Sequence, residues 1–495
     1  MKTLKKFLSD SSIYGKLVLL IGLLIAVPLL VVLFYPEEKS YIPAFLAPSA
    51  FSAALGLAIC FLPKRKETTP AKWQSPLQRG SLPVMFAWCF AFLAGAVPFV
   101  AGGQLNFSLA FFESVSGWTT TGLTVANVTE TPHIFLFHRA FMQFCGGLGF
   151  IIMIAMLAQG KQNMALYNAE GHPDSLMPSL KKTSRTIFLL YNCFLAAGVL
   201  TYCLSGMNLF DAVCHAMSAL STAGFTTQAD SIGHYGSLPI EITTVVLMLI
   251  GSSNFAILLL LVKGKFRQIL RVSEVQFMIV LLLVSVPLVS FSLMREMDMS
   301  FGESLAESLF GIVTTFTTSG YSTMNYSLWP PFALGLLMIM MIIGGSAGST
   351  AGGIKLLRAY LLIRIVKENI RNRLSPARLV IKPEYYRVQG KMPVDNTLIN
   401  DTVGFIACYL AVFIIGTLLL TLTAHCPLFD AMFEFASAFG TVGISNGLTN
   451  AGASIGSLFV LIIGMTLGRL EIFIVFIGLY AGIQVLKEKI YKKDF

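Results

Sequence analysis

The chain has 495 residues, of which 55% are hydrophobic and only 12% are charged. Soluble proteins carry roughly 25% charged residues, so this composition excludes an ordinary water-soluble globular protein. Apolar runs of about 20 residues, long enough to cross a bilayer as a helix, recur along the whole sequence. We predict ten such spans, near residues 15–35, 43–62, 82–104, 133–158, 184–205, 237–262, 274–294, 332–361, 402–424 and 454–486.

The net charge of +10 is distributed unevenly along the chain. All Lys and Arg except Lys39, Arg139, Arg295 and Arg469 fall within residues 2–16, 64–79, 161–185, 263–271, 355–391 and 487–493. If the N-terminus is cytoplasmic, all six segments are cytoplasmic, as the positive-inside rule requires. We therefore expect a multi-pass protein with both termini in the cytoplasm. Nucleic acid is not an expected partner, because the basic residues are divided among loops and no aromatic RNA-binding motif accompanies them.

The first span and the cysteines need no special role. Lys2, Lys5 and Lys6 precede an apolar run, as in a secretory signal, but no small-residue cleavage site follows residues 31–35. We therefore expect a retained span. The eight cysteines lie mostly in or beside spans without any CxxC pair, which is typical of buried apolar thiols.

Four segments of the chain share one pattern, a short amphipathic stretch followed by Thr-x-Gly. The aligned glycines are Gly122, Gly224, Gly320 and Gly443. Two positions earlier stand Thr120, Thr222, Thr318 and Thr441, and between them and the glycines stand Thr121, Ala223, Ser319 and Val442. The glycines are followed by the bulky residues Leu123, Phe225, Tyr321 and Ile444, and then by the hydroxyl residues Thr124, Thr226, Ser322 and Ser445. Thirteen positions before the glycine, Asp211, Glu307 and Asp430 predict helix N-caps, with Ser108 taking this role in the first repeat.

Each Thr-x-Gly segment lies between two long apolar runs. This predicts an all-α membrane protein, in which four tandem span–pore helix–filter–span repeats surround one pseudo-fourfold pore and two extra spans precede them. The predicted units are a two-span extension (1–80), repeat 1 (81–165), repeat 2 (183–265), repeat 3 (273–370), a cytoplasmic linker (371–400) and repeat 4 (401–495).

This arrangement predicts a potassium pathway. Non-helical backbone at membrane depth is tolerated where it lines a water-filled path, and a ring of carbonyl oxygens can replace the hydration shell of K⁺. Glycine permits the left-handed backbone that turns a carbonyl toward the axis, and each threonine adds a hydroxyl. The C-terminal ends of the short helices favour a cation in the cavity. The four Thr-x-Gly segments, with the residue after each glycine, are therefore the predicted K⁺ ligands and the only expected metal site.

These residues resemble a known family. Thr441-Val442-Gly443-Ile444-Ser445 is similar to the potassium-channel signature Thr-Val-Gly-Tyr-Gly, and four non-identical copies in one chain resemble the Trk/Ktr/HKT superfamily. The two extra N-terminal spans, residues 166–171 and the basic segment 355–391 are similar to its bacterial TrkH and TrkG branch. The resemblance implies a gated K⁺ uptake subunit of the bacterial inner membrane. It also implies a homodimer regulated by a cytosolic nucleotide-binding ring of the TrkA type.

A run of small residues interrupts span 332–361. Helix propensity falls across residues 344–353, since each glycine costs about 1 kcal/mol relative to alanine. Following the resemblance, we expect an intramembrane loop that gates the path, formed by Gly344, Gly345, Ser346, Gly348, Ser349, Thr350, Gly352 and Gly353. Close helix packing through small residues is the alternative. A phosphate-binding loop is disfavoured, because Lys355 lacks the flanking residues and no strand precedes it.

Several polar residues fall within or beside the spans. Arg469 either faces the pore and acts with the loop as part of the gate, or pairs with Glu471. Arg139 is expected at the membrane interface, with a role in the ion path as the alternative. Residues nine positions before the glycine, among them Glu113 and Glu434, are expected to form hydrogen bonds behind the filter. Segment 355–400 either lies on anionic membrane lipid or docks a partner.

Two other functions compete with a gated pore. A symporter coupled to H⁺ or Na⁺ needs ionisable groups at membrane depth, where the spans offer few acids apart from Glu471. An intramembrane enzyme is disfavoured, because the spans contain no Ser/His/Asp set, metal cluster or paired carboxylates. The chain has no nucleotide-binding fingerprint and no expected organic cofactor, so any response to a nucleotide must come from another polypeptide.

Overall fold

The computed structural model describes residues 12–61, 76–149, 180–374 and 383–491, and most of them are helical. Six helices in these ranges are long and apolar enough to cross a membrane, or eight spans if each of two bent pairs counts as one. Many large apolar side chains on the outer faces of these helices are exposed, among them Leu283, Phe291 and Leu418. Such surfaces are typical of contact with lipid, so the prediction of an all-α membrane protein is confirmed.

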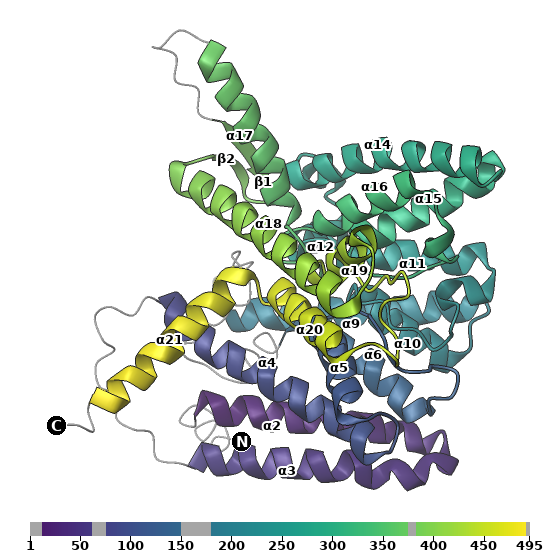
Figure 1. Cartoon of the computed structure of the whole chain (residues 1–495), viewed down its shortest axis with the longest axis vertical. Helices are drawn as coiled ribbons and strands as arrows, with labels where there is room; N and C mark the ends of the chain where they lie inside the picture. The colour runs from purple at the N-terminus through teal and green to yellow at the C-terminus, as the bar shows by residue number, and fades with distance from the viewer. Residues whose placement is uncertain (1–11, 62–75, 150–179, 375–382, 492–495) are drawn as a thin grey trace.

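The N-terminal extension packs beside the first repeat. Helix α2 (Ile13–Ala26) continues through η1 (Val27–Leu33), and η2 (Pro36–Tyr41) leads into α3 (Ile42–Phe61). Helices α2 and α3 pack against each other, and both contact α4 (Figure 1). The buried carboxylate of Glu38 accepts hydrogen bonds from the backbone N–H groups of His133 and Ile134, both at 2.8 Å. Glu38 thereby caps a helix of the first repeat whose own N-cap residue, Pro132, forms no side-chain bond.

Four units of like construction follow the extension. Their first helices are α4 (Pro76–Ala101), α9 (Leu180–Leu204), α14 (Ser273–Glu296) and α18 (Asn396–Ala424). Their short helices are α5 (Phe107–Trp118), α10 (Leu209–Leu220), α15 (Phe301–Phe316) and α19 (Leu428–Phe439). Their closing segments are α6 (His133–Leu148), α11 (Leu238–Gly251) with α12 (Phe255–Val262), α16 (Pro331–Ile342) with α17 (Leu356–Leu374), and α20 (Ile455–Arg469) with α21 (Ile472–Tyr491).

The four units pack as a closed ring. The closing helix of each unit contacts the short helix of the next, in the pairs α6–α10, α11–α15, α16–α19 and α20–α5. The last pair joins the fourth unit to the first, so every short helix has the same two kinds of neighbour. The boundary of repeat 1 at residue 165 and residues 166–171 lie outside the described residues.

The predicted N-caps of the short helices are wrong. The structure places the caps at Asn106, Asn208 and Ser300, whose side chains accept N–H bonds, and at Pro427 in the fourth unit. Asp211 stands three residues inside α10, and Glu307 lies within α15. The side chains of Asp211 and Glu307 instead bind the loops that follow their helices, as described below.

Two predicted spans are broken helices. Helices α11 and α12 meet at a bend of 118°, and α20 and α21 meet at 101°. At the first break, the amide oxygen of Asn254 accepts the N–H of Ala256 at 2.7 Å and so starts a new helix. At the second break, Glu471 adopts a left-handed backbone with φ of 57°. Residues 150–158, the end of the span predicted at 133–158, lie outside the described residues.

The predicted cytoplasmic linker contains a small sheet. Strands β1 (Glu384–Arg387) and β2 (Gly390–Pro393) form an antiparallel hairpin that pairs Tyr385 with Met392. The N–H of Tyr386 donates to the hydroxyl of Ser273 at 3.0 Å, which attaches the hairpin to the start of α14. Residues 375–382 lie outside the described residues. Short elements η3 (Ser231–Tyr235), α13 (Phe266–Ile269) and η4 (Tyr326–Leu328) complete the connections.

Candidate functional site

The four Thr-x-Gly segments share one unusual backbone conformation. All four threonines have positive φ, at 55° for Thr120, 52° for Thr222, 56° for Thr318 and 52° for Thr441. The glycines two positions later also have positive φ, between 75° and 97°. A threonine in this region is rare because its branched side chain crowds the backbone. Its occurrence at the same position of every unit shows that the surrounding structure imposes it.

The four glycines lie in a single closed ring. A methyl group placed on Gly122 would lie 2.1 Å from the carbonyl oxygen of Ala223, in the second unit. The same construction brings Gly224 to 2.1 Å from Ser319 O, Gly320 to 1.9 Å from Val442 O, and Gly443 to 2.1 Å from Thr121 O. Each glycine therefore faces the carbonyl of the next unit, and the fourth faces the first. We call residues 120–124, 222–226, 318–322 and 441–445 the ring segments.

Four hydroxyl residues six positions before the ring glycines were not predicted as part of the site, and the hydroxyls of two of them bind the ring. Ser116 accepts the N–H of Gly122 at 3.1 Å, and Ser437 accepts that of Gly443 at 3.0 Å. The corresponding residues, six positions before the glycine, are Ser218 and Thr314 in the other two units. In all four units the backbone carbonyl at this position also accepts the N–H of the residue before the glycine, at 2.8–3.0 Å. Extending the alignment by a few positions would have revealed these residues.

Four acids, of which Glu113, Asp211 and Glu434 are buried, bind the ends of the ring segments or the residues directly after them, in two ways. In the first and fourth units, Glu113 and Glu434 accept hydrogen bonds from the hydroxyls two positions after the glycine, Thr124 at 2.9 Å and Ser445 at 2.8 Å. In the second and third units, acids thirteen positions before the glycine accept from hydroxyls three positions after it. These pairs are Asp211 with Thr227 at 2.6 Å and Glu307 with Thr323 at 2.5 Å. The expected hydrogen bonds of Glu113 and Glu434 are thus present.

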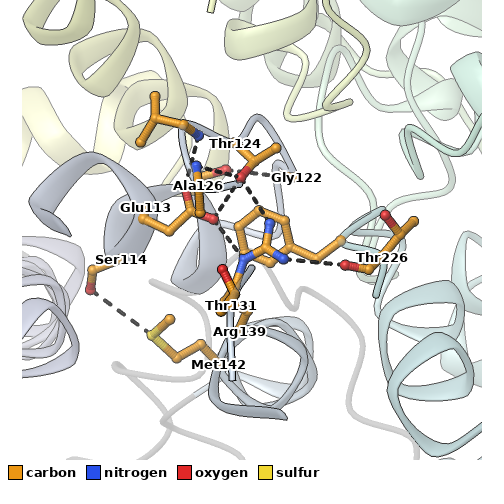
Figure 2. A network of polar contacts seen from close by, with 12 residues as sticks. Glu113, Ser114, Gly122, Thr124, Ala126, Thr131, Arg139, Met142 and Thr226 are labelled. Atoms are coloured by element: carbon orange, nitrogen blue, oxygen red, sulfur yellow. Dashed lines mark hydrogen bonds and ion pairs between the residues drawn. The ribbon is translucent and has the colours of Figure 1, made fainter. Parts of the chain in front are cut away.

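Arg139 is buried at the boundary between the first and second units, so the prediction of an interfacial position is wrong. Its Nε atom lies 2.7 Å from Glu113, in an ion pair whose two side chains are 1% and 0% exposed. Its other nitrogens donate to the hydroxyl of Thr124 at 2.9 Å and to the carbonyl of Thr226 at 3.2 Å. Figure 2 shows this side chain reaching from α6 to both ring segments. No local pattern indicates this pairing, because Glu113 and Arg139 are 26 residues apart in the chain.

The remaining predicted ring residues are buried around the same ring. Leu123, Phe225, Tyr321 and Ile444, which follow the glycines, are all at most 4% exposed. The hydroxyl of Tyr321 donates to the carbonyl of His215 at 3.1 Å. Thr121 and Ser319 have their hydroxyls at 2.8 and 2.9 Å from Thr119 and Thr317 of their own segments. The Tyr321 contact joins the third ring segment to α10 of the second unit, whereas the Thr119 and Thr317 contacts join the first and third segments to the C-caps of α5 and α15.

The predicted interruption of span 332–361 is a non-helical loop over residues 343–355. Its ends are held together by backbone bonds, from Gly344 N to Ile354 O at 3.0 Å and from Ile354 N to Ile342 O at 2.8 Å. A methyl group on Gly344 would lie 1.8 Å from the carbonyl of Gly352, so the crossing requires glycine. Close helix packing, the alternative interpretation, does not describe this segment, since it is not helical.

The first half of the loop packs against the second unit. The N–H of Ser346 donates to Ser252 O at 3.0 Å, and the side chain of Asn254 donates to Ala347 O at 2.6 Å. Gly345 also contacts Ser252, and Gly348, with φ of 73°, faces Asn254. The hydroxyl of Ser349 donates to Ser346 O at 2.7 Å. The loop therefore binds the second unit at the break between α11 and α12.

The second half of the loop touches the threonines of three ring segments. The hydroxyl of Thr350 lies 3.0 Å from that of Thr222, and the N–H of Gly352 donates to the hydroxyl of Thr318 at 3.0 Å. A methyl group on Gly352 would lie 2.1 Å from the hydroxyl of Thr441. Gly353, with φ of 68°, turns the chain back toward Gly344.

Arg469 joins the loop to the first unit. It donates to the carbonyl of Thr350 in the loop, and to the carbonyl of Gly146 in α6 at 2.6 Å. Glu471 forms an ion pair with Arg358 of α17 at 3.0 Å. The structure therefore brings Arg469 together with the predicted loop residues, next to the ring.

The groups in this site that could bind an ion are mostly uncharged carbonyl and hydroxyl oxygen atoms. Among the described residues, no group of three His, Cys, Asp or Glu side chains could hold a metal ion. The hydroxyls of Thr120 and Thr441 are buried without a hydrogen-bond partner in the described part of the chain. A ring of carbonyl and hydroxyl oxygens of this kind suits a weakly hydrated monovalent cation.

Comparisons with known proteins agree with this geometry. Residues 49–480 match the TrkH family model, described as a cation transport protein. The chain is 30% identical to the Trk system potassium uptake protein TrkG of Escherichia coli (strain K12), over 94% of this chain and 96% of that protein. It is 30% identical to TrkH of Salmonella typhimurium, over 94% of this chain and 97% of that protein.

A solved structure supports the same assignment. The crystal structure of the potassium transporter TrkH from Vibrio parahaemolyticus superposes with a TM-score of 0.82 at 28% identity, and covers 95% of this chain and 98% of that one. These relatives are transport proteins and not enzymes, as the sequence predicts. The chain therefore belongs to the TrkH family of cation transport proteins.

Proposed function

We propose that this chain is the potassium-conducting subunit of a Trk-type uptake system, with the ring segments as its selectivity filter. The observation that carries this proposal is the closed ring, in which each of the four glycines faces a carbonyl of the next unit. Four equivalent backbone segments can surround one ion with main-chain oxygens, and such oxygens replace the hydration shell of K⁺ at little cost. The relatives named above carry potassium uptake in their names, which supports K⁺ as the cargo.

The loop 343–355 is the gate of this pathway in our proposal. Its contacts with Thr222, Thr318 and Thr441 place it against the last oxygens of the filter. Arg469 adds a positive charge at the same level and ties the loop to α6. A cation leaving the ring on this side meets both a steric obstruction and an unfavourable charge. Conduction then requires the loop to move away from the threonines.

The distribution of basic loops supports a cytoplasmic position for both termini. Membership of the TrkH family supports the bacterial inner membrane as the location. We further propose a homodimer that is regulated by a cytosolic nucleotide-binding subunit of the TrkA type. The basic segment that includes α17 and the β1–β2 hairpin lies on the cytoplasmic side in this orientation, where such a subunit could bind.

Ion flux in proteoliposomes tests the function. The purified chain, alone and with a candidate regulatory subunit, should carry K⁺ in preference to Na⁺. K⁺ flux without accompanying movement of H⁺ or Na⁺ is expected for a pore, whereas acidification that follows K⁺ uptake would indicate the symporter. Restored growth of a potassium-uptake-deficient bacterium on limiting K⁺ is the matching test in cells. Failure of both assays would overturn the proposal.

A further inference from the structure

One polar side chain contacts a ring segment on both sides of its glycine. The side chain of Gln143, in α6, donates to the carbonyl of Ala223 at 2.8 Å and accepts the N–H of Phe225 at 3.2 Å. Gln143 is 0% exposed, and Gly224, between these two residues, has φ of 77°. One amide group thus binds both peptide groups that flank the left-handed residue.

Gln143 is reinforced by Arg139, one helical turn earlier. The guanidinium group of Arg139 lies 4.0 Å from the centre of the Phe225 ring and donates to Thr226 O. Two side chains of the first unit therefore contact three residues of the second ring segment, Ala223, Phe225 and Thr226. Residues four apart lie on the same face of a helix, so α6 presents both side chains to the second ring segment.

The other unit boundaries lack this arrangement at the corresponding position. Gly146, Gly251 and Gly468 are structurally equivalent, because a methyl group on each would lie 2.0–2.3 Å from the carbonyl four positions before a ring glycine. Three positions before them stand Gln143, Met248 and Met465. In the third unit the last turn of α16 carries Met340 and Met341, and all four methionines are buried. Met cannot donate a hydrogen bond, so the first boundary differs in kind from the others.

We propose that Gln143 is a positioning residue that sets the selectivity of the ion pathway through the second ring segment. This inference rests on the proposed function, since it assigns Gln143 to the proposed filter. The amide fixes the direction of the Ala223 carbonyl and draws electron density from its oxygen. Both the geometry and the field strength of ring carbonyls bear on the preference for K⁺ over Na⁺. Gln143 makes this segment stiffer, and its carbonyl a weaker ligand, than its counterparts.

The variants Gln143→Met and Gln143→Leu test the inference. Met is the residue of the other units, and Leu has a similar volume but a different shape. Both remove both hydrogen bonds, so an effect that the two share comes from the bonds and not from shape. In proteoliposomes we expect the K⁺/Na⁺ flux ratio to fall by at least about fivefold, the factor that corresponds to the loss of one net hydrogen bond. Gln276→Met, in α14, is the matched control. The side chain of Gln276 is exposed and donates to Leu270 O, and both residues are distant in sequence from the ring segments.

The outcomes separate this inference from the proposed function. A K⁺-selective parent protein with unchanged selectivity in a folded Gln143 variant would overturn the role of Gln143 and leave the proposed function intact. Failure of both variants to fold, judged by size-exclusion chromatography, would make Gln143 a stability residue and would also overturn the inference. A parent protein that does not prefer K⁺ would contradict the proposed function itself, and the inference with it. A lowered ratio in both variants, with the control unchanged, would support it.

Discussion

The hydroxyl of Thr350 in the loop 343–355 lies 3.0 Å from the hydroxyl of Thr222 in the second ring segment. Thr350 also donates to the carbonyl of Gly251 at 2.9 Å, so it joins the loop, the ring and the end of α11 at one point. Any movement that clears the path below the ring must break these contacts. In the proposed gate, these few buried hydrogen bonds, each typically worth about 1 kcal/mol, stabilise the closed state.

Replacing Thr350 with valine should raise K⁺ flux in the absence of a regulatory subunit. The substitution keeps the shape and removes the hydroxyl, which leaves Gly251 O without this donor and shifts the loop toward release. Loss of one such bond should increase basal flux about fivefold. Flux into proteoliposomes measures this, with Thr243→Val as the control, because the hydroxyl of Thr243 binds only within α11, to Pro239 O. Equal flux in Thr350→Val and the parent protein would contradict the proposed gate.

Arg469 should contribute to the gate through both its charge and its hydrogen bonds. Arg469→Ala removes the charge and the bonds to Thr350 O and Gly146 O, so basal K⁺ flux should rise most in this variant. Arg469→Lys keeps the charge but has no planar fork to reach both carbonyls, and we expect an intermediate rise. If the alanine variant conducts no faster than the parent protein, Arg469 has a structural role only.

A side chain on a ring glycine should reduce the discrimination between K⁺ and Na⁺. In Gly320→Ser and Gly443→Ser, the new Cβ atom would lie 1.9 and 2.1 Å from a carbonyl oxygen of the next unit, and φ is positive at both positions. The ring must therefore widen or the carbonyls must turn. Relative Na⁺ flux is the measurement. Gly335→Ser is the control, because a Cβ atom at this position in α16 meets no atom within 4 Å. Unchanged selectivity in both ring variants would contradict the assignment of the filter.

The sequence was sufficient to predict those parts of the site that repeat or break a strong pattern. The Thr-x-Gly columns occur four times, and the run from Gly344 to Gly353 opposes helix formation strongly enough to be recognised alone. The place where this loop binds the second unit could not be predicted from the sequence. It is the helix break at Asn254, and this break depends on one side chain that caps α12 and binds Ala347 O. The residues on both sides of this break are as apolar as those of a continuous membrane-spanning helix.

Contacts between the units also could not be predicted from the sequence. Arg139 stands at the start of an apolar run, where a cation usually marks the membrane interface. Its burial follows from the packing of α6 against α10, which brings the second ring segment within reach. Acidic residues near helix starts suggested caps, yet Asp211 binds Thr227, after the ring glycine. Local sequence patterns do not distinguish a helix cap or an interfacial cation from a residue that binds a ring segment, because the binding partners come together only in the folded ring.

The ion pair of Arg139 and Glu113 should be important for stability. Both side chains are almost fully buried, and removing one partner leaves an uncompensated charge, which typically costs about 3–5 kcal/mol. Glu113→Gln should therefore lower the unfolding temperature in detergent strongly. The double variant Glu113→Gln with Arg139→Met removes both charges and should recover part of the loss.

The partly exposed pair of Arg358 and Glu471 provides the comparison. Its side chains are 27% and 19% exposed, so water screens the charges and we expect Glu471→Gln to cost only about 1 kcal/mol or less. Thermal unfolding followed by tryptophan fluorescence is measured for the parent protein, Glu113→Gln, Arg139→Met, their double variant and Glu471→Gln. An equal loss in Glu113→Gln and Glu471→Gln would show that burial does not decide the contribution of these pairs. Additive losses in the double variant would show that Arg139 and Glu113 stabilise the protein independently, through their other contacts with the ring segments.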